Sequence, residues 1–528
     1  MKTHVVSFVL ILSAFADLSV SARSVPVVPK LVIGITIDQL RTDYVEAFSD
    51  LFGENGFKRL WKEGRVYGNT EYTFANPDRA STVAAIYTGT TPSLNGIIGE
   101  YWMDRATLRP VHCTDDYAFM GNYTDESSSP AHLLTSTIAD ELKVATKGNG
   151  WVYAISPFRE AALFAAGHAG DGAFWLEGNT GKWCGTTYYK SFPQWVSRYN
   201  EKSSVDFRIE SLVWSPLLPV GKYTHLISEW KKETFKYKFD EKKANKYKRF
   251  VTSPLVNDEV NALAEECLNY SLVGKDDIPD LLLLTYYAGL YNNMSSMESS
   301  LEIQDTYVRL DKCLAQLIEL VEKKYGLQNV VFVLVSTGQT RPEAPDLSKY
   351  RIPAGEFYLN RCAALLNIYL MAVYGEGNYV ETYYDRQIYL NRKLIEDRRL
   401  NLAEIQDKCA GFLIQFSGVK DVYSAYRLLL GAWTPDMDKV KNAFNYRRSG
   451  DVWIDLLPGW VVVDENPVMN KTVRYAHAPA PLIFMGGGIK PDVIYTPVSA
   501  GCIAPTLANF MKIRAPNACT ERSLWGID

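Results

Sequence analysis

Chemically active side chains gather in one short stretch of the sequence, residues 74–100 (FANPDRASTVAAIYTGTTPSLNGIIGE). Within it, the charged pair Asp78 and Arg79 precedes two hydroxyl residues, Ser81 and Thr82, where a helical pattern begins. A hydroxyl at a helix start can act as a nucleophile toward a phosphoryl group, or it can simply cap the helix. Arg79 cannot be a nucleophile, because its guanidinium stays protonated. The stretch therefore predicts either a working site or one that has lost its nucleophile.

The elements around this stretch follow the alternating pattern of an α/β protein. Apolar, strand-like runs occupy residues 30–38, 151–155, 280–287 and 329–337. Helical periodicity falls between them, at residues 44–64, 133–145 and 301–326. This order predicts a central, mostly parallel sheet flanked by helices, in which chemistry collects at the carboxyl ends of the strands. Asp38 closes the first strand, so we expect its carboxylate to lie at that edge.

Two regions interrupt this pattern and are predicted to be insertions that form a cap or subdomain, roughly residues 169–270 and 345–450. The first begins with a predicted hairpin around an Asn-Thr-Gly turn. It continues into residues 228–250, which carry nine Lys and Arg against four Asp and Glu. Basic residues interleaved with Tyr and Phe could grip an anionic partner, or they could belong to an ordinary solvated helix or loop. The second region mixes short strand and helix patterns and is predicted to cover the strand ends.

The first 22 residues predict a signal peptide, and the mature domain would then span residues 23–528. Lys2 precedes a twelve-residue apolar run at residues 5–16, and small residues follow up to Ala22. The run is too short for a bilayer, which needs roughly 20 residues, and no later stretch suits a membrane span. We therefore expect an exported protein, periplasmic or extracellular and soluble. A net charge of −4 gives no sign of a nucleic-acid partner.

Seven stretches, in order along the chain, resemble the alkaline phosphatase superfamily, in its branch of bacterial alkaline phosphatases and nucleotide pyrophosphatase/phosphodiesterases. They are LVIGITIDQLRTDY, IYTGTTPSLNGIIG, AAGHAGDGAFWLEGNTGKW, DTYVRLDKCLAQLIELVEKKYG, RIPAGEFYLNR, RRSGDVWIDLLPGW and APLIFMGGGIKP. Together they cover nearly all of the mature chain. The resemblance implies the fold of that superfamily, and it implies hydrolysis of phosphate esters at a site with two zinc ions.

At the positions that the resemblance assigns to this site, the chain departs from the family pattern. The family nucleophile, a Thr or Ser, falls on Arg79, and an Asn that grips phosphate falls on Glu100. The Asp and His metal ligands fall on Tyr286, Leu290, Ser336, Thr337 and Pro479. Asp38 alone keeps a family ligand, none of the six histidines stands at a ligand position, and the eight cysteines form no CxxC pair. We therefore expect no metal and no cofactor.

Three functions stay open from the sequence. In the first, the chain is a pseudoenzyme that binds a protein partner or an anionic ligand, and Arg79 either offers a cation to that ligand or pairs with Asp38 or Asp78 in place of metal charge. Its candidate ligand-binding residues are Asp38, Arg79, Ser81, Arg159 and His477. In the second, it is an active phosphatase or phosphodiesterase with a non-standard site that uses Ser81, Thr82 or His477. In the third, it is a component of a cell-envelope assembly.

Overall fold

The computed structural model describes residues 28–189, 191–226, 233–239, 245–294, 298–340, 353–431, 434–463 and 476–524. Its centre is an 11-stranded sheet with the strand order β22-β2-β21-β12-β1-β11-β6-β7-β8-β5, in which β23 also pairs with β2. The strands are β1 (Leu31–Asp38), β2 (Arg65–Glu71), β5 (Gly121–Asn122), β6 (Val152–Ser156), β7 (Gly172–Leu176), β8 (Trp183–Thr186), β11 (Asp280–Tyr287), β12 (Val330–Ser336), β21 (Ala480–Gly486), β22 (Asp492–Ile494) and β23 (Val498–Ser499).

The middle of this sheet is parallel, as the strand pattern predicts. β12, β1, β11, β6 and β7 run in one direction, while β21 and β8 lie antiparallel on either side of them. The four predicted apolar strands are β1, β6, β11 and β12, each found within one residue of its expected start. Their side chains are buried along their whole length, because helices cover both faces of a parallel sheet. The predicted α/β fold is confirmed.

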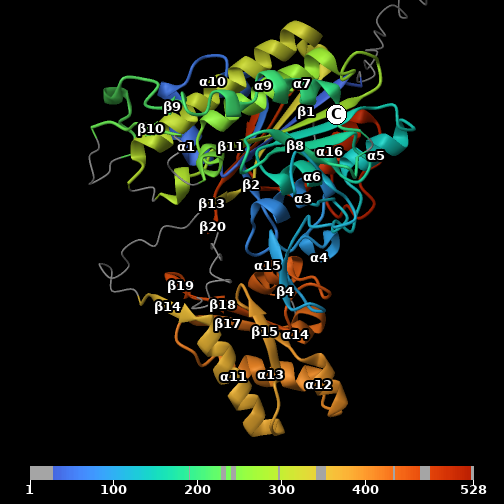
Figure 1. Ribbon diagram of the computed structural model, residues 1–528, viewed down its shortest axis with the longest axis vertical. Helices are drawn as coiled ribbons and strands as arrows, with labels where there is room; N and C mark the ends of the chain where they lie inside the picture. Colours follow the sequence, from blue (N-terminus) through green and yellow to red (C-terminus); the bar gives the residue numbers. More distant parts are fainter. Residues whose placement is uncertain are drawn as a thin grey trace, which may run out of the picture.

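Helices form a layer on each face of the sheet (Figure 1). Side chains alternate across β1, so that Ile33, Ile35 and Ile37 pack into one core while Val32 packs into the other. The first core includes side chains from α1 (Thr42–Ala47), α2 (Phe57–Glu63), α7 (Gln194–Lys202), α9 (Leu255–Tyr270) and α10 (Ser300–Tyr325). The second includes side chains from α3 (Arg79–Thr88), α5 (Ile138–Ala145), α6 (Arg159–Ala166) and α16 (Ile503–Met511).

Residues 353–463 form a smaller lobe with its own core, drawn in orange below the main body in Figure 1. Its sheet has the order β15-β16-β18-β17. The elements of the lobe are β14 (Gly355–Tyr358), α11 (Leu359–Tyr374), β15 (Val380–Tyr384), β16 (Gln387–Leu390), α12 (Arg392–Asp397), α13 (Leu402–Leu413), β17 (Val419–Ser424), α14 (Ala425–Leu430), α15 (Pro435–Ala443), β18 (Val452–Leu456) and β19 (Trp460–Val463). Arg105 of the main body donates to Asp451 and to the Ser449 carbonyl, which ties the two parts together. The predicted region 345–450 thus contains most of this lobe.

The predicted insertion at residues 169–270 lies partly inside the core. Its predicted hairpin is confirmed as β7 and β8, which pair antiparallel in the main sheet, and α9 packs against β11. Between them lie α7, α8 (Lys246–Val251) and the small pair β9 (Val213–Trp214) and β10 (Tyr237–Lys238). In the described part of residues 228–250, Phe235 and Phe239 are buried in the first core, while Lys236 and Lys238 are exposed. The rings of Phe235 and Phe239 therefore stabilise the fold by packing in the first core.

The predicted helix at residues 44–64 is two helices, α1 and α2, with the 3-10 turn η1 (Ser49–Leu51) between them. The start of α2 is fixed by Asp311 of α10, whose carboxylate accepts from the backbone N–H groups of Gly53 and Phe57 at 2.8 and 2.7 Å. A Cβ at Gly56 would lie 2.4 Å from the Asp311 carbonyl oxygen, so this close approach requires glycine. The break between α1 and α2 therefore depends on a contact with α10, which the helical periodicity of residues 44–64 does not reveal.

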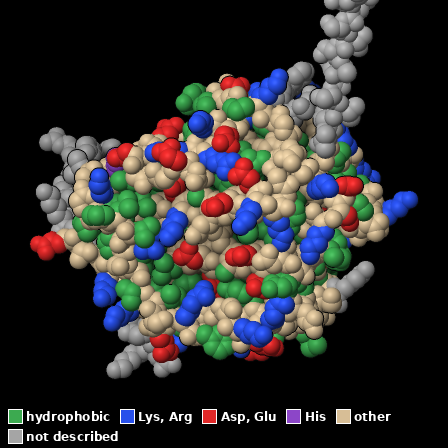
Figure 2. Space-filling model, turned by 90° about the horizontal axis from the view of Figure 1, so that it is seen from above, with side chains coloured by type: hydrophobic (Ala, Val, Ile, Leu, Met, Phe, Trp, Pro, Cys, Tyr) green, Lys and Arg blue, Asp and Glu red, His purple; other side chains and the backbone are tan. Residues whose placement is uncertain are grey.

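Charged side chains of both signs are interspersed on the face shown in Figure 2, in keeping with the net charge of −4. A mixed surface of this kind offers no continuous basic stripe for nucleic acid. Within the described ranges, no helix combines the length and the apolar character that crossing a bilayer requires. The predicted signal peptide at residues 1–22 lies outside these ranges.

Candidate functional site

The carboxyl ends of three neighbouring strands bring the predicted site positions together. In the parallel register, Asp38 of β1 lies opposite Tyr287 of β11, and Ile37 lies opposite Ser336 of β12. The N-terminus of α3 approaches the same edge, because Arg79 Nη1 lies 2.9 Å from Asp38 Oδ2. The structure therefore gathers these residues at the edge of the sheet that the strand pattern predicts.

Asp38 is fully buried, and both of its carboxylate oxygens have partners. Oδ1 accepts hydrogen bonds from Thr337 Oγ1 at 2.9 Å and from Gln339 Nε2 at 2.8 Å, and Oδ2 accepts from Arg79 Nη1. The next residue, Gln39, has a φ of +63°, and its N–H donates to Thr337 Oγ1 at 3.0 Å. A buried carboxylate requires partners of this kind. Here the side chains of Thr337, Gln339 and Arg79 are those partners.

The Arg79 guanidinium bridges two buried carboxylates. Besides its bond to Asp38, its Nε donates to Glu160 Oε1 at 2.5 Å, and its Cζ lies 3.5 Å from the centre of the Phe158 ring. Burial pushes the pKa of Glu160 upward, but the charge of Arg79 and its hydrogen bond to Glu160 outweigh burial, so that this pKa is lowered. Glu160 is therefore ionised beside the guanidinium. Of the two roles expected for Arg79, the structure shows the pairing with Asp38.

The two hydroxyls of the stretch serve the start of α3. Asp78 and Ser81 form a capping box, in which the Ser81 N–H donates to Asp78 Oδ1 at 2.9 Å and the Asp78 N–H donates to Ser81 Oγ at 3.0 Å. Thr82 Oγ1 donates to the Asp78 carbonyl at 2.7 Å. Both hydroxyl residues are buried, at 1% and 0% exposure. Neither hydroxyl is therefore presented to solvent as a nucleophile would be.

Glu100 and His112 lie beside Arg79 and Glu160, with His112 Nε2 3.9 Å from Glu100 Oε1. Burial, together with the charge of Glu160, raises the pKa of Glu100 to about 7. Burial, together with the charge of Arg159, lowers the pKa of His112 to about 4. The Glu100 side chain is 39% exposed, so solvent moderates its shift, whereas the His112 side chain is only 6% exposed. At neutral pH the imidazole is neutral and Glu100 is near its titration midpoint.

Arg159, the other candidate cation, is also engaged. Its Nη2 donates to Asp115 Oδ1 at 3.2 Å and its Nη1 to Ser128 Oγ at 3.1 Å, with Glu126 Oε2 3.7 Å away. Its side chain is 13% exposed. Each of the two arginines at this site is thus balanced by two carboxylates.

The remaining positions assigned by the resemblance carry structural side chains. Tyr286 is fully buried, and its hydroxyl donates to Asn261 Oδ1 at 2.6 Å. Leu290 is apolar and packs against the first core. Ser336 Oγ donates to the Leu40 carbonyl at 2.6 Å. These side chains therefore hold the strand ends in place.

Two further candidates come from the segment before β21. The Pro479 carbonyl accepts a hydrogen bond from the Thr42 N–H at 3.0 Å, which joins this segment to the start of α1. His477 belongs to β20 (Ala476–His477), which pairs with β13 (Gln339–Thr340). The backbone of His477 thus lies opposite Gln339, a partner of Asp38, while its side chain is outside the described part of the structure.

The side chains at these positions do not fit two zinc ions. Asp38 is the one carboxylate at the family ligand positions, and donors from the chain satisfy both of its oxygens. Across the described residues, no three or more His, Cys, Asp or Glu side chains are grouped so that they could hold a metal ion. A zinc site takes three or four such ligands, and a guanidinium beside it repels a cation. The described donors at these positions therefore do not fit the metal chemistry that the resemblance implies.

Three residues of this cluster were not predicted: Glu160, His112 and Gln339. Glu160 has a sequence signal, because it is the one acid in the helical run REAALFAA, which is otherwise apolar after its first residue. His112 ends β4 (Arg109–His112), and Gln339 stands in β13. They reach the cluster only through tertiary packing, so their spacing in the sequence gives no signal.

Comparisons with known proteins extend over nearly the whole chain. The model of the type I phosphodiesterase / nucleotide pyrophosphatase family matches residues 32–477. Alkaline phosphatase PafA of Elizabethkingia meningoseptica is 29% identical over 514 residues, which cover 94% of this chain and 94% of that protein. A protein of Myroides odoratus named calcium-transporting ATPase is 29% identical over 93% of each chain. Alkaline phosphatase PhoV of Synechococcus elongatus is 29% identical over 93% of this chain and 91% of its own.

The fold agrees with these sequence relationships. The crystal structure of wild-type PafA superposes with a TM-score of 0.83, at 29% identity, over 96% of this chain and 99% of that one. The family model spans most of the chain, and the architecture described above extends through both the main body and the smaller lobe. This chain belongs to the type I phosphodiesterase / nucleotide pyrophosphatase family, within the alkaline phosphatase superfamily.

Proposed function

We propose that this chain is an exported family member that has lost two-zinc phosphoester hydrolysis and acts as a pseudoenzyme, in binding or as a component of a cell-envelope assembly. The observation that carries the proposal is the Arg79 guanidinium, which lies 2.9 Å from Asp38 and 2.5 Å from Glu160. Arg79 stands at the register position of the family nucleophile. Its cation balances Asp38, which stands at a family metal-ligand position, together with Glu160, and it cannot attack phosphorus.

The charges around Arg79 also disfavour a phosphate ligand. Besides Asp38 and Glu160, the carboxyl groups of Asp78 and Glu100 lie close enough to Glu160 for the charge of Glu160 to raise their pKa values in addition to the effect of burial. A phosphate dianion would have to displace a carboxylate from Arg79 and then face the remaining ones. Because the site already holds this excess of acids, a protein partner that contacts another surface is the better candidate than an anionic ligand bound here.

A second candidate is an active phosphatase or phosphodiesterase with a non-standard site. Glu100 favours it, because a partly exposed carboxyl group with a pKa of about 7 can act as a general base at neutral pH. The relatives named alkaline phosphatases, at 29% identity over nearly full length, point the same way. In this mechanism Glu100 would activate water, since the hydroxyls of Ser81 and Thr82 are buried in the helix cap.

Hydrolysis assays distinguish the two functions. The purified mature chain is incubated with p-nitrophenyl phosphate and bis-p-nitrophenyl phosphate, once with added zinc and once with a chelator, with PafA as the parallel control. We expect no rate above that of buffer for this chain. A zinc-dependent rate would overturn the proposal. A chelator-resistant rate that disappears in Glu100→Gln would establish the second candidate.

The binding role is tested separately on the exposed lysines in the described part of residues 228–250. Deleting this stretch would remove buried rings of the core, so charge reversal of exposed residues is the sharper change: Lys236→Glu, Lys238→Glu and Lys248→Glu. The matched control reverses two exposed lysines of the smaller lobe, Lys393→Glu and Lys408→Glu. We expect crosslinks in native envelope extracts that the first variant loses and the control keeps. A chain that is monomeric and uncrosslinked in such extracts would count against an assembly role.

A further inference from the structure

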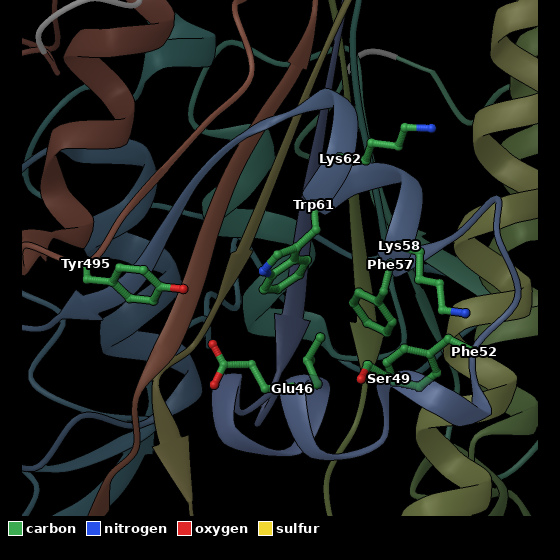
Figure 3. Close-up of a pocket in the computed structure, with 9 residues that line it drawn as sticks. Glu46, Ser49, Phe52, Phe57, Lys58, Trp61, Lys62 and Tyr495 are labelled. Carbon is green, nitrogen blue, oxygen red and sulfur yellow. The ribbon is translucent and has the colours of Figure 1, made fainter.

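A pocket of about 560 Å³ opens on the first helical layer, away from Arg79 and from the other residues of the candidate functional site. α1, η1 and α2 supply most of its walls, and Tyr495, which follows β22, closes the far side (Figure 3). Its floor is apolar, and Phe57 packs edge-on against Trp61 with ring centres 6.3 Å apart. A volume of this size suits a small organic molecule.

The polar groups of this pocket divide into two sides. In Figure 3, the Glu46 carboxylate, the Trp61 indole and the Tyr495 hydroxyl point toward one region, while the ammonium groups of Lys58 and Lys62 point to the opposite side. Lys58 is already paired with Glu54 at 2.9 Å. The Glu46 carboxylate makes no hydrogen bond or ion pair with any other described residue. The acidic side of the pocket therefore has charge that no described side chain matches.

Tyr495 and Trp61 differ in how firmly the fold supports them, since Tyr495 is 70% exposed and Trp61 is half-buried. The Tyr495 side chain packs over Gly68 of β2, where an added Cβ would lie 3.3 Å from the ring. Trp61 is half-buried on α2 beside Phe57, so its indole has little freedom to turn away. Two electron-rich rings and a carboxylate that face one region are the chemistry by which proteins hold organic ammonium ions.

We propose that this pocket binds a small organic ammonium ion, with the cation between Trp61, Tyr495 and Glu46 and its alkyl body on the apolar floor. The interaction is reversible and independent of the proposed loss of hydrolysis. It does not involve Arg79, Asp38 or Glu160. Trp61 contributes an electron-rich ring, the Tyr495 hydroxyl contributes an oxygen, and the Glu46 carboxylate contributes the charge.

Choline and its uncharged isostere 3,3-dimethylbutan-1-ol test the proposal, since they share their shape and differ in charge. Binding to the full mature chain is measured by calorimetry and by saturation-transfer NMR at constant ionic strength. We expect saturable choline binding and at least tenfold weaker binding of the alcohol. Equal binding of the two, or no saturable binding of choline, would overturn the proposal.

Single substitutions then assign the binding to this pocket. Glu46→Gln removes an exposed charge without disturbing the core and should weaken choline binding at least fivefold. Lys62→Gln, the matched control one helical turn from Lys58, should leave choline binding unchanged or make it tighter. Trp61→Leu should abolish it, with a thermal melt to confirm that the variant is folded. Choline binding that survives Glu46→Gln, or that weakens in Lys62→Gln, contradicts the proposal.

Discussion

Arg79 and Asp38 lie 41 positions apart in the chain, and they meet at 2.9 Å beneath the carboxyl edge of the sheet. Asp38 is fully buried, and the Arg79 side chain is 17% exposed. The pair lies at the place where the family resemblance puts a nucleophile and a metal ligand. A buried ion pair of this kind is stabilising only while both partners and their hydrogen bonds are present. The chain therefore keeps the fold of its family around an internal salt bridge.

Removing Arg79 should destabilise the fold strongly. Arg79→Ala leaves Asp38 and Glu160 buried without their cation, and we expect the free energy of unfolding to fall by about 3–5 kcal/mol, measured by urea denaturation. Lys30→Ala is the matched control, because Lys30 pairs with the exposed Asp277 at 2.6 Å. That surface pair should contribute at most about 1 kcal/mol. Equal losses in the two variants would show that Arg79 does not balance the buried acids.

The strand pattern of the sequence predicted the sheet because its central strands are buried on both faces. Such strands read as continuous apolar runs, as in VVFVLVS of β12, and their order with the helices predicts the parallel arrangement. Asp38 could be placed at the site for the same reason, since an acid that ends an apolar strand falls at the carboxyl edge. What the sequence could not show is which side chains meet Asp38. Gln339 and Glu160 arrive there through tertiary packing that no local period encodes.

The three buried charges should behave as one unit. Neutralising both acids in the Arg79 variant (Arg79→Ala, Asp38→Asn and Glu160→Gln together) removes the unpaired charges that make the single change costly. We expect this triple variant to recover at least about 1–2 kcal/mol relative to Arg79→Ala alone, measured by the same denaturation. A triple variant that is less stable than Arg79→Ala would mean that the acids are stabilised by other groups.

The Ser81 hydroxyl should matter for stability and not for chemistry. Ser81→Ala breaks the capping box at α3 and should lower the free energy of unfolding by about 1 kcal/mol. Thr137→Ala is the comparison variant, because it removes the hydroxyl of the capping box at α5. There Thr137 is the N-cap residue and Asp140 is the third helical residue. Both variants should hydrolyse p-nitrophenyl phosphate no differently from the unmodified chain. A hydrolysis rate that Ser81→Ala alone abolishes would identify Ser81 as a nucleophile.

His112 should make stability depend on pH. Its pKa is lowered to about 4 in the folded chain, mainly by burial, so the native imidazole is neutral where an unfolded one would take up a proton. The free energy of unfolding contributed by His112 is therefore present above about pH 6.5 and is lost as the pH falls toward 4.

His112→Asn isolates this effect. The stability difference between the unmodified chain and the variant should shrink by about 1–2 kcal/mol between about pH 6.5 and about pH 4.5. Glu100, whose pKa is raised to about 7, acts in the opposite direction and is present in both proteins, so comparing them largely cancels its contribution. A stability difference that is constant over this range would show that His112 titrates normally in the folded state.

The zinc content of the purified mature chain shows whether metal or the Arg79 guanidinium balances Asp38. The chain is exchanged through zinc-containing buffer, freed of loosely bound metal and measured by elemental mass spectrometry, with PafA prepared in parallel. We expect close to zero zinc per chain, because Asp38 is the one family ligand and Arg79 is bound to it. About two zinc ions per chain, the content of a two-metal phosphoesterase site, would contradict the account.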